Sequence, residues 1–264
     1  MTTGKRIRLE NIFRRQTGNS VVVALDHGGI AGPVKGIEHP ALVVKQCIEG
    51  GADAILTTRG VITATEGEWR RETSIIMRIT GGFTVLGGLF EEELISSPQA
   101  ALRLGASAVV VTVKIGTSRE GESIKQASLV ADECEKWGLP LMVEAIAKNK
   151  DMRPADPAGV KLAARAAQEI GADIIKTYYT GDPQTFSEVV EGCPVPVLIL
   201  GGEKTDNLEN VFRDVHDAIK AGSRGIAMGR NIWQQRDTRA MVEAMVGIVH
   251  KGWTVSEAMK HTGL

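Results

Sequence analysis

One short pattern occurs four times along the chain and does most to restrict its possible folds. Each copy begins with a glycine after an amphipathic stretch and continues into a short, mostly β-branched run. A glycine in this place is typical of a helix C-terminus, and an apolar run without alternation is typical of a parallel strand buried on both faces. The copies are Gly51-Ala-Asp-Ala-Ile-Leu-Thr-Thr58, Gly105-Ala-Ser-Ala-Val-Val-Val-Thr112, Gly171-Ala-Asp-Ile-Ile-Lys-Thr177 and Gly222-Ser-Arg-Gly-Ile-Ala-Met228. The chain is therefore expected to alternate helices with parallel strands.

Four further apolar runs bring the expected number of strands to eight. They are Ser20–Asp26, Phe83–Gly88, Pro140–Ala145 and Pro196–Gly202. Eight strands alternating with helices in 264 residues favour a closed α/β fold, the (β/α)8 TIM barrel, over an open doubly wound sheet. An open sheet would be expected to carry an early dinucleotide-binding glycine turn, whereas residues 28–32 are only loosely glycine-rich.

The length suits one domain over residues 1–264, with residues 1–19 capping the bottom of the barrel and residues 252–264 forming a short helical tail. The net charge of −1 indicates neither a nucleic-acid partner nor a membrane partner, so any phosphate must be bound by local groups. No signal peptide or membrane span fits the sequence. The three cysteines are far apart, which suits a reducing cytoplasm, and no metal-ligand spacing occurs.

Lys176 is the strongest single indication of chemistry. It directly follows the apolar run of the third repeat, so its amine is expected at the mouth of the barrel, where the active sites of these barrels lie. Burial disfavours the ammonium form, and a neutral amine can attack a carbonyl to form a Schiff base. The alternative is a structural lysine that forms an ion pair with Asp26 or Glu144 and takes no part in a reaction.

Three other charged residues are candidates for catalysis because they interrupt or end apolar strands. Asp26 ends the first strand and could orient the lysine or relay a proton, or could simply cap a loop. Glu144 lies inside the fifth strand and is either an acid–base group or the ion-pair partner of Lys114 or Lys176. Lys114, at the end of the fourth strand, could lower the pKa of the lysine, bind a substrate anion, or be a plain surface residue.

The last two strands end in sequences that suit a phosphate. Loops after the seventh and eighth strands form the usual phosphate site of such barrels, where backbone N–H groups do most of the binding. Gly201 and Gly202 allow close approach of the backbone, while Gly229 leads into Arg230, which can add a charged contact. His27 and Arg59, at the ends of the first two strands, complete the expected substrate-binding set, although a histidine beside glycines is more often part of the scaffold.

Four stretches together resemble the archaeal-type class I fructose-bisphosphate aldolase family. They are Ala24-Leu-Asp-His-Gly28, Ile175-Lys-Thr-Tyr-Tyr-Thr-Gly-Asp182, Gly192-Cys-Pro-Val-Pro-Val197 with the following glycine pair, and Met228-Gly-Arg-Asn-Ile-Trp-Gln234. The family includes aminodideoxyheptulosonate synthases and the autoinducer-2 phosphate thiolase. The resemblance implies that Lys176 is the Schiff-base lysine, that Asp26 assists proton transfer, that no metal or other cofactor is needed, and that the chain assembles as a homo-oligomer, often a decamer.

The sequence departs from the aldolases of this family on the fifth strand. Their Trp-x-Tyr pair carries the acid–base tyrosine, and the matching residues here are Glu144 and Ile146. An isoleucine cannot transfer a proton, so Glu144 or Lys114 is expected to replace the tyrosine, or the substrate needs no such group. Aldol cleavage of a small phosphorylated ketose or diketone, acyl transfer with coenzyme A as co-substrate, an isomerase without covalent chemistry and a non-catalytic binding barrel all remain open.

Overall fold

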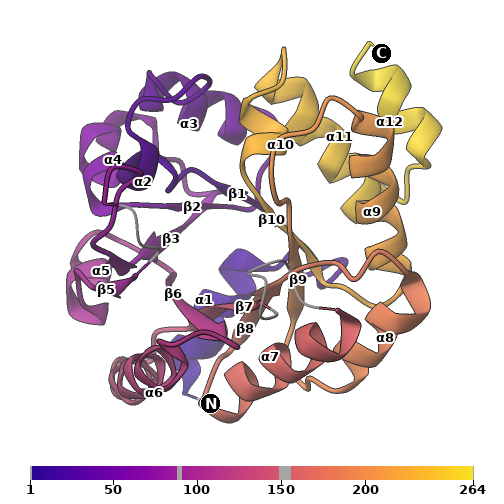
Figure 1. Ribbon diagram of the computed structural model, residues 1–264. Coiled ribbons are helices and arrows are strands. Elements are labelled where there is room, and N and C mark those ends of the chain that lie inside the picture. The colour runs from indigo at the N-terminus through magenta and orange to yellow at the C-terminus, as the bar shows by residue number, and fades with distance from the viewer. Residues whose placement is uncertain (1, 88–90, 149–155, 264) are drawn as a thin grey trace.

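Eight parallel strands close into a barrel in the computed structural model, which describes residues 2–87, 91–148 and 156–263 (Figure 1). The predicted (β/α)8 fold is therefore confirmed. The barrel strands are β1 (Ser20–Ala24), β2 (Ala54–Thr57), β3 (Ser74–Arg78), β6 (Ala108–Ile115), β7 (Leu141–Ala147), β8 (Ile174–Thr177), β9 (Val197–Leu200) and β10 (Gly225–Met228). Each strand pairs with its neighbours along the chain, and β1 closes the ring by pairing with β10.

Helices surround the barrel and link its strands (Figure 1). They are α2 (Gly28–Ala31), α3 (Pro40–Glu49), α4 (Arg59–Ala64), the 3-10 helix η1 (Glu66–Glu68), α5 (Pro98–Arg103), α6 (Glu120–Trp137), α7 (Pro157–Glu169), α8 (Pro183–Glu191), α9 (Leu208–Lys220), α10 (Arg230–Trp233) and α11 (Thr238–Lys251). Buried aliphatic side chains fill the layer between helices and strands. Among the described residues, no helix has the length and apolar character to cross a membrane.

The two ends of the chain pack against the barrel in different ways. Helix α1 (Thr3–Ile12) lies below the strands, where Leu9, Ile12 and Phe13 pack with the side chains that fill the barrel interior. Helix α12 (Val255–His261) follows Gly252, which ends α11 in a left-handed conformation, and packs against α9 and α11. Helix α1 therefore covers the amino-terminal end of the barrel interior.

The third barrel strand is not where the sequence analysis placed it. The run Phe83–Gly88 was expected to be a strand, but residues 83–87 form a loop and Gly88 lies outside the described residues. The strand in the barrel is Ser74–Arg78, which pairs with β2 and β6. It is buried along its first four residues and lacks the glycine signal that marks the four repeats, which is why the pattern missed it. A short antiparallel pair, β4 (Thr80–Gly81) and β5 (Glu93–Leu94), follows it.

Candidate active site

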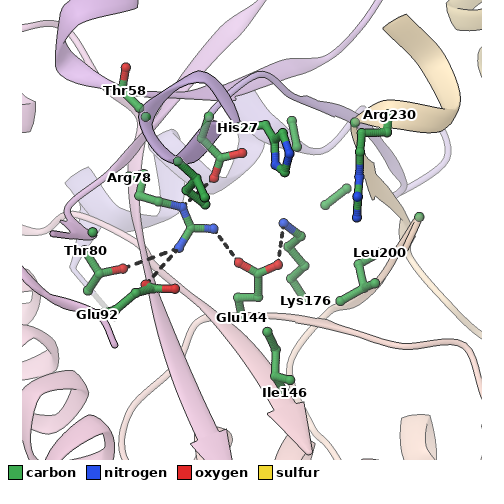
Figure 2. A pocket seen from close by; sticks show the side chains of 18 of the residues that line it. His27, Thr58, Arg78, Thr80, Glu92, Glu144, Ile146, Lys176, Leu200 and Arg230 are labelled. Atoms are coloured by element: carbon green, nitrogen blue, oxygen red, sulfur yellow. Dashed lines mark hydrogen bonds and ion pairs between the residues drawn. The ribbon is translucent and has the colours of Figure 1, made fainter. Parts of the chain in front are cut away.

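A pocket of about 280 Å³ opens among the carboxyl ends of the barrel strands (Figure 2). Eight of the ten predicted site residues line it: Asp26, His27, Glu144, Lys176, Gly201, Gly202, Gly229 and Arg230. These residues follow or end strands that are far apart in the sequence. Closure of the barrel brings them around one space, which is how this architecture assembles active sites.

Lys176 and Glu144 form an ion pair inside this pocket. They occupy neighbouring positions on β8 and β7, and 2.7 Å separates Lys176 Nζ from Glu144 Oε1. Both side chains are largely buried, with exposed fractions of 7% and 14%. Burial by itself would raise the pKa of Glu144, but the nearby charges of Lys176 and Arg78 outweigh it and lower that pKa to about 2. Glu144 is therefore a carboxylate at neutral pH, and Lys176 is its ion-pair partner.

Arg78, at the end of β3, ties this pair to Asp26. Its Nε donates a hydrogen bond to Asp26 Oδ2, and its Nη2 donates one to Glu144 Oε2. Nη1 donates to Thr112 Oγ1 at 2.8 Å and lies 3.7 Å from a carboxylate oxygen of Glu92. Burial lowers the pKa of Arg78, but the charges of the three carboxylates raise it above its ordinary value. The arginine is thus a fixed cation between Asp26 and Glu144. Figure 2 shows its contact with Glu144.

The predicted phosphate-binding residues lie together on the other side of the pocket. Gly201 and Gly202 follow β9, and Gly229 and Arg230 follow β10. Because β9 and β10 are paired neighbours in the barrel, the two loops border the same part of the pocket. A buried asparagine joins the two loops: Asn231 Nδ2 donates to the carbonyl oxygens of Gly201 (2.6 Å) and Glu203 (2.9 Å). Its Oδ1 accepts a hydrogen bond from the backbone of Thr205 at 2.9 Å.

His27 lies beside this glycine-rich region at the first turn after β1. Its pKa is lowered, first by burial and then by the charge of Arg230. The imidazole therefore favours its neutral form at neutral pH, in which one ring nitrogen donates and the other accepts a hydrogen bond. A neutral histidine can contact a phosphate or a hydroxyl group without competing with Arg230 for the negative charge.

Two predicted site residues do not line the pocket. Arg59 is the first residue of α4 and points to the loop before α5, where its Nη2 donates to Ser96 Oγ at 3.2 Å. Thr58 takes the place at the pocket that had been expected of Arg59. Lys114 is buried in β6, and its Nζ lies 4.0 Å from Glu92, which does line the pocket. Burial lowers the pKa of Lys114, while the nearby Glu92 opposes this effect.

Comparison with known proteins identifies the family. A model of the DeoC/LacD family aldolases matches residues 20–235, which is most of the chain and includes every barrel strand. The chain belongs to the DeoC/LacD aldolase family. The resemblance to class I aldolases inferred from its motifs is thereby confirmed.

Relatives of this aldolase cover nearly its whole length. A 3-hydroxy-5-phosphonooxypentane-2,4-dione thiolase of Escherichia coli is 36% identical over 255 residues, which is 97% of this chain and 85% of the relative. A 2-amino-4,5-dihydroxy-6-oxo-7-(phosphonooxy)heptanoate synthase of Streptomyces griseus is 29% identical over 260 residues, covering 98% and 95%. The two relatives differ in their reactions, so family membership fixes the class of enzyme and leaves the individual reaction open.

A solved structure supports the same class of chemistry. An archaeal fructose-1,6-bisphosphate aldolase, with its catalytic lysine covalently bound to the carbinolamine intermediate of the substrate, is 32% identical and covers 93% of this chain and 99% of its own. The TM-score is 0.83. The protein is therefore an aldolase-type enzyme of the class I, Schiff-base family. In the part of this aldolase that the structure describes, no group of three or more His, Cys, Asp and Glu side chains could hold a metal ion.

Several residues of this aldolase's pocket were missed by the sequence analysis. Arg78 was missed because its strand was placed wrongly, and Glu92 because it follows no barrel strand. Tyr178 lies two residues after Lys176, and this spacing could have identified it because alternate residues of a strand face the same side. Burial and the charge of Glu144 raise the pKa of Tyr178, so its hydroxyl stays protonated. Ile146 also lines the pocket, as the departure from the aldolase pattern implies.

Proposed function

We propose that this aldolase forms or cleaves a carbon–carbon bond in a small phosphorylated ketose or diketone through a Schiff base on Lys176. The observation that carries the proposal is the placement of Lys176, whose side chain is 7% exposed and whose amine lies 2.7 Å from a carboxylate, in a pocket bordered by two glycine-rich loops. A buried lysine that served only as a structural partner would not need to face such a cavity.

The first step makes the amine neutral and then consumes it. Glu144 takes a proton from the Lys176 ammonium, and the amine nitrogen attacks the substrate carbonyl carbon to form a carbinolamine. Glu144 gives its proton to the carbonyl oxygen as this bond forms, and Asp26 takes a second proton from the nitrogen, which leaves a neutral carbinolamine. Asp26 then gives that proton to the same oxygen, which leaves as water, and the iminium remains. When the adjacent carbon–carbon bond breaks, its electron pair moves to the iminium nitrogen and produces an enamine.

Glu144 suits this first step because of its place and its charge. Its Oε1 touches the amine, and the carboxylate can accept the proton without any movement of the chain. Asp26 lies in the same pocket and accepts a hydrogen bond from Arg78, so it can relay protons to the departing oxygen. In this assignment Glu144 and Asp26 share the work that the family tyrosine performs in other aldolases.

The phosphate of the substrate would be held on the opposite side of the pocket. Backbone N–H groups of Gly201, Gly202 and Gly229 can approach its oxygens closely, and Arg230 can supply a charge-assisted contact. His27 lines the same side of the pocket and can contact the phosphate or a hydroxyl group of the substrate. Binding the phosphate there orients the carbonyl toward Lys176, and this orientation accounts for much of the rate enhancement in such enzymes.

One observation favours a second candidate reaction, acyl transfer to coenzyme A by the same lysine. Ile146 occupies the place of the acid–base tyrosine, and the relative from Escherichia coli is a thiolase. In that reaction, a thiolate attacks a second carbonyl of the iminium-bound diketone. The bond between the attacked carbonyl carbon and the carbon next to the iminium carbon then breaks, and its electron pair moves to the iminium nitrogen. No proton has to be removed from a substrate hydroxyl group, so no tyrosine is required.

Borohydride trapping tests the proposal. The protein is incubated with a panel of phosphorylated ketoses and diketones, reduced with borohydride, digested and analysed by mass spectrometry. We expect a stable secondary amine on Lys176, none in Lys176→Met, and an unchanged adduct in Lys125→Met, which alters an exposed lysine of α6. Substrate binding without any adduct on Lys176 would refute Schiff-base chemistry in favour of an isomerase or a binding barrel. Product analysis with and without coenzyme A separates acyl transfer from aldol cleavage.

A further inference from the structure

Arg78 holds two carboxylates of the active site at once. Its Nε donates a hydrogen bond to Asp26 and its Nη2 donates one to Glu144. Its Nη1 donates to Thr112 on the neighbouring strand β6. The side chain is only 10% exposed, and its donors are occupied by the protein, so it is poorly placed to bind a substrate anion. Its contacts point instead to an effect on the two carboxylates.

The two oxygens of Glu144 have different partners. Oε1 lies against Lys176 Nζ, and Oε2 accepts the hydrogen bond from Arg78. This division fixes the plane of the carboxylate, since both oxygens are held. It also means that Glu144 has a second cation when the first one disappears.

The first cation does disappear during the proposed reaction. Lys176 is a cation as the ammonium and as the iminium, but its nitrogen is neutral in the carbinolamine, when Glu144 has given its proton to the substrate oxygen and is a carboxylate again. Without another positive partner, a carboxylate that is 14% exposed would then be buried without a compensating charge, which is strongly unfavourable. Arg78 is placed to prevent this.

We propose that Arg78 is a positioning residue that fixes Glu144 and Asp26 and keeps Glu144 ionised in the carbinolamine, where the Lys176 nitrogen is neutral. The inference rests on the proposed Schiff-base chemistry. It assigns to Arg78 an effect on the reacting groups through the two carboxylates, with no contact to the substrate.

The charges around Glu144 determine what removal of Arg78 would do. The titratable groups that face Glu144 or Arg78 from the surrounding elements are Asp26 after β1, Glu92 before β5, Lys176 in β8 and Tyr178 after it, with Lys114 of β6 facing Glu92. Without Arg78, Asp26, Glu92 and Glu144 would lose the cation that they share. Burial and their mutual repulsion would then favour protonation of Glu144.

A protonated Glu144 cannot accept a proton from Lys176, so the loss of Arg78 should show in the pH dependence of Schiff-base formation. The assay is single-turnover borohydride trapping with the phosphorylated ketose or diketone that gives the highest adduct yield in the wild type. In Arg78→Met we expect the acid limb of the trapping rate to move upward by about one pH unit or more, since a nearby opposite charge shifts a carboxyl by about one to three. In Arg78→Lys the positive charge is kept, but a single ammonium cannot bond to both carboxylates as the guanidinium does. A smaller upward shift of the acid limb is therefore expected.

A double variant separates positioning from a general loss of structure. If Arg78 acts through Glu144, the acid limb in Glu144→Gln must not move further when Arg78→Met is added. A rate that falls by the same factor at every pH, or an equal shift in the Glu144→Gln background, would overturn the inference. Arg103→Met, at an exposed position of α5, should leave the profile unchanged.

The outcomes also distinguish this inference from the function beneath it. Absence of any Lys176 adduct in the wild-type protein would refute the Schiff-base proposal itself. A normal adduct with an unshifted profile in the Arg78 variants would refute only the positioning role. If thermal denaturation shows that Arg78→Met is not folded, Arg78→Lys is used in its place. A pH profile of the trapping rate in Arg78→Lys that superimposes on that of the wild type would then count against the inference.

Discussion

Replacing Glu144 with glutamine should change how the stability of this aldolase depends on pH. In the folded protein, burial is outweighed by the charges of Lys176 and Arg78, so the pKa of Glu144 falls from an ordinary value of 4.5 to about 2. Such a fall corresponds to about 3 kcal/mol, at about 1.4 kcal/mol for each pKa unit. Because the folded pKa is the lower one, this contribution is fully present above 4.5 and is lost as the pH falls toward about 2.

The window within reach of experiment lies on the upper part of this range. At about pH 3.5 the unfolded chain has already bound a proton at this residue whereas the folded chain has not, so the wild type should have lost about 1 kcal/mol relative to about pH 7 through Glu144 alone. Glutamine does not titrate. The free-energy difference between wild type and Glu144→Gln should therefore shrink by about 1 kcal/mol over this interval.

Urea denaturation followed by circular dichroism at several pH values measures this difference. All other carboxyl groups titrate in both proteins, so subtracting one curve from the other isolates Glu144. Glu72→Gln, at an exposed position, controls for the loss of one negative charge at the surface. A difference between wild type and Glu144→Gln that stays constant from neutral to acid pH would show that Glu144 is not held as a carboxylate by Lys176 and Arg78.

Three further predictions concern the phosphate loops and the closure of the barrel. Arg230→Gln should raise the KM for phosphorylated substrates by about tenfold or more, because a charged hydrogen bond contributes about 1.5–3 kcal/mol, and steady-state kinetics with an unphosphorylated analogue should show a much smaller change. Asn231→Ala should lower the free energy of unfolding in urea by about 1–3 kcal/mol, since it removes the buried amide that donates hydrogen bonds to the carbonyl oxygens of Gly201 and Glu203. Gly225→Ala should prevent soluble expression, because a Cβ there would lie 1.8 Å from the carbonyl oxygen of Ser20 at a φ of +130°, whereas Gly121→Ala in α6, with no atom within 4 Å, should be neutral or stabilising in thermal denaturation.

Much of the architecture could be read from local sequence. The four glycine-led repeats coincide with β2, β6, β8 and β10, and the fold they predicted is the one observed. Lys176, Gly201 and Arg230 could be nominated because each lies at or just after the end of an expected strand, and active-site residues of parallel barrels gather at the carboxyl ends of strands. These inferences needed only strand direction and residue type, both of which are local properties.

The partners of these residues were decided only by tertiary structure. Glu144 could have paired with Lys114 or Lys176, and the register between β7 and β8 sets it beside Lys176. Arg59 was expected at the pocket, yet α4 begins at that residue and the side chain turns toward Ser96. Arg78 escaped notice because a single arginine at the end of an unmarked strand carries no local signal.

The physical reason is that a pocket of this kind exists only after the sheet has closed. Which two carboxylates can share one guanidinium depends on strand order, stagger and side-chain direction around the whole ring, and these are set by packing of all eight strands against their helices. The sequence determined which groups stand at the ends of strands. The closed barrel determined which of them meet, and therefore which charges they hold.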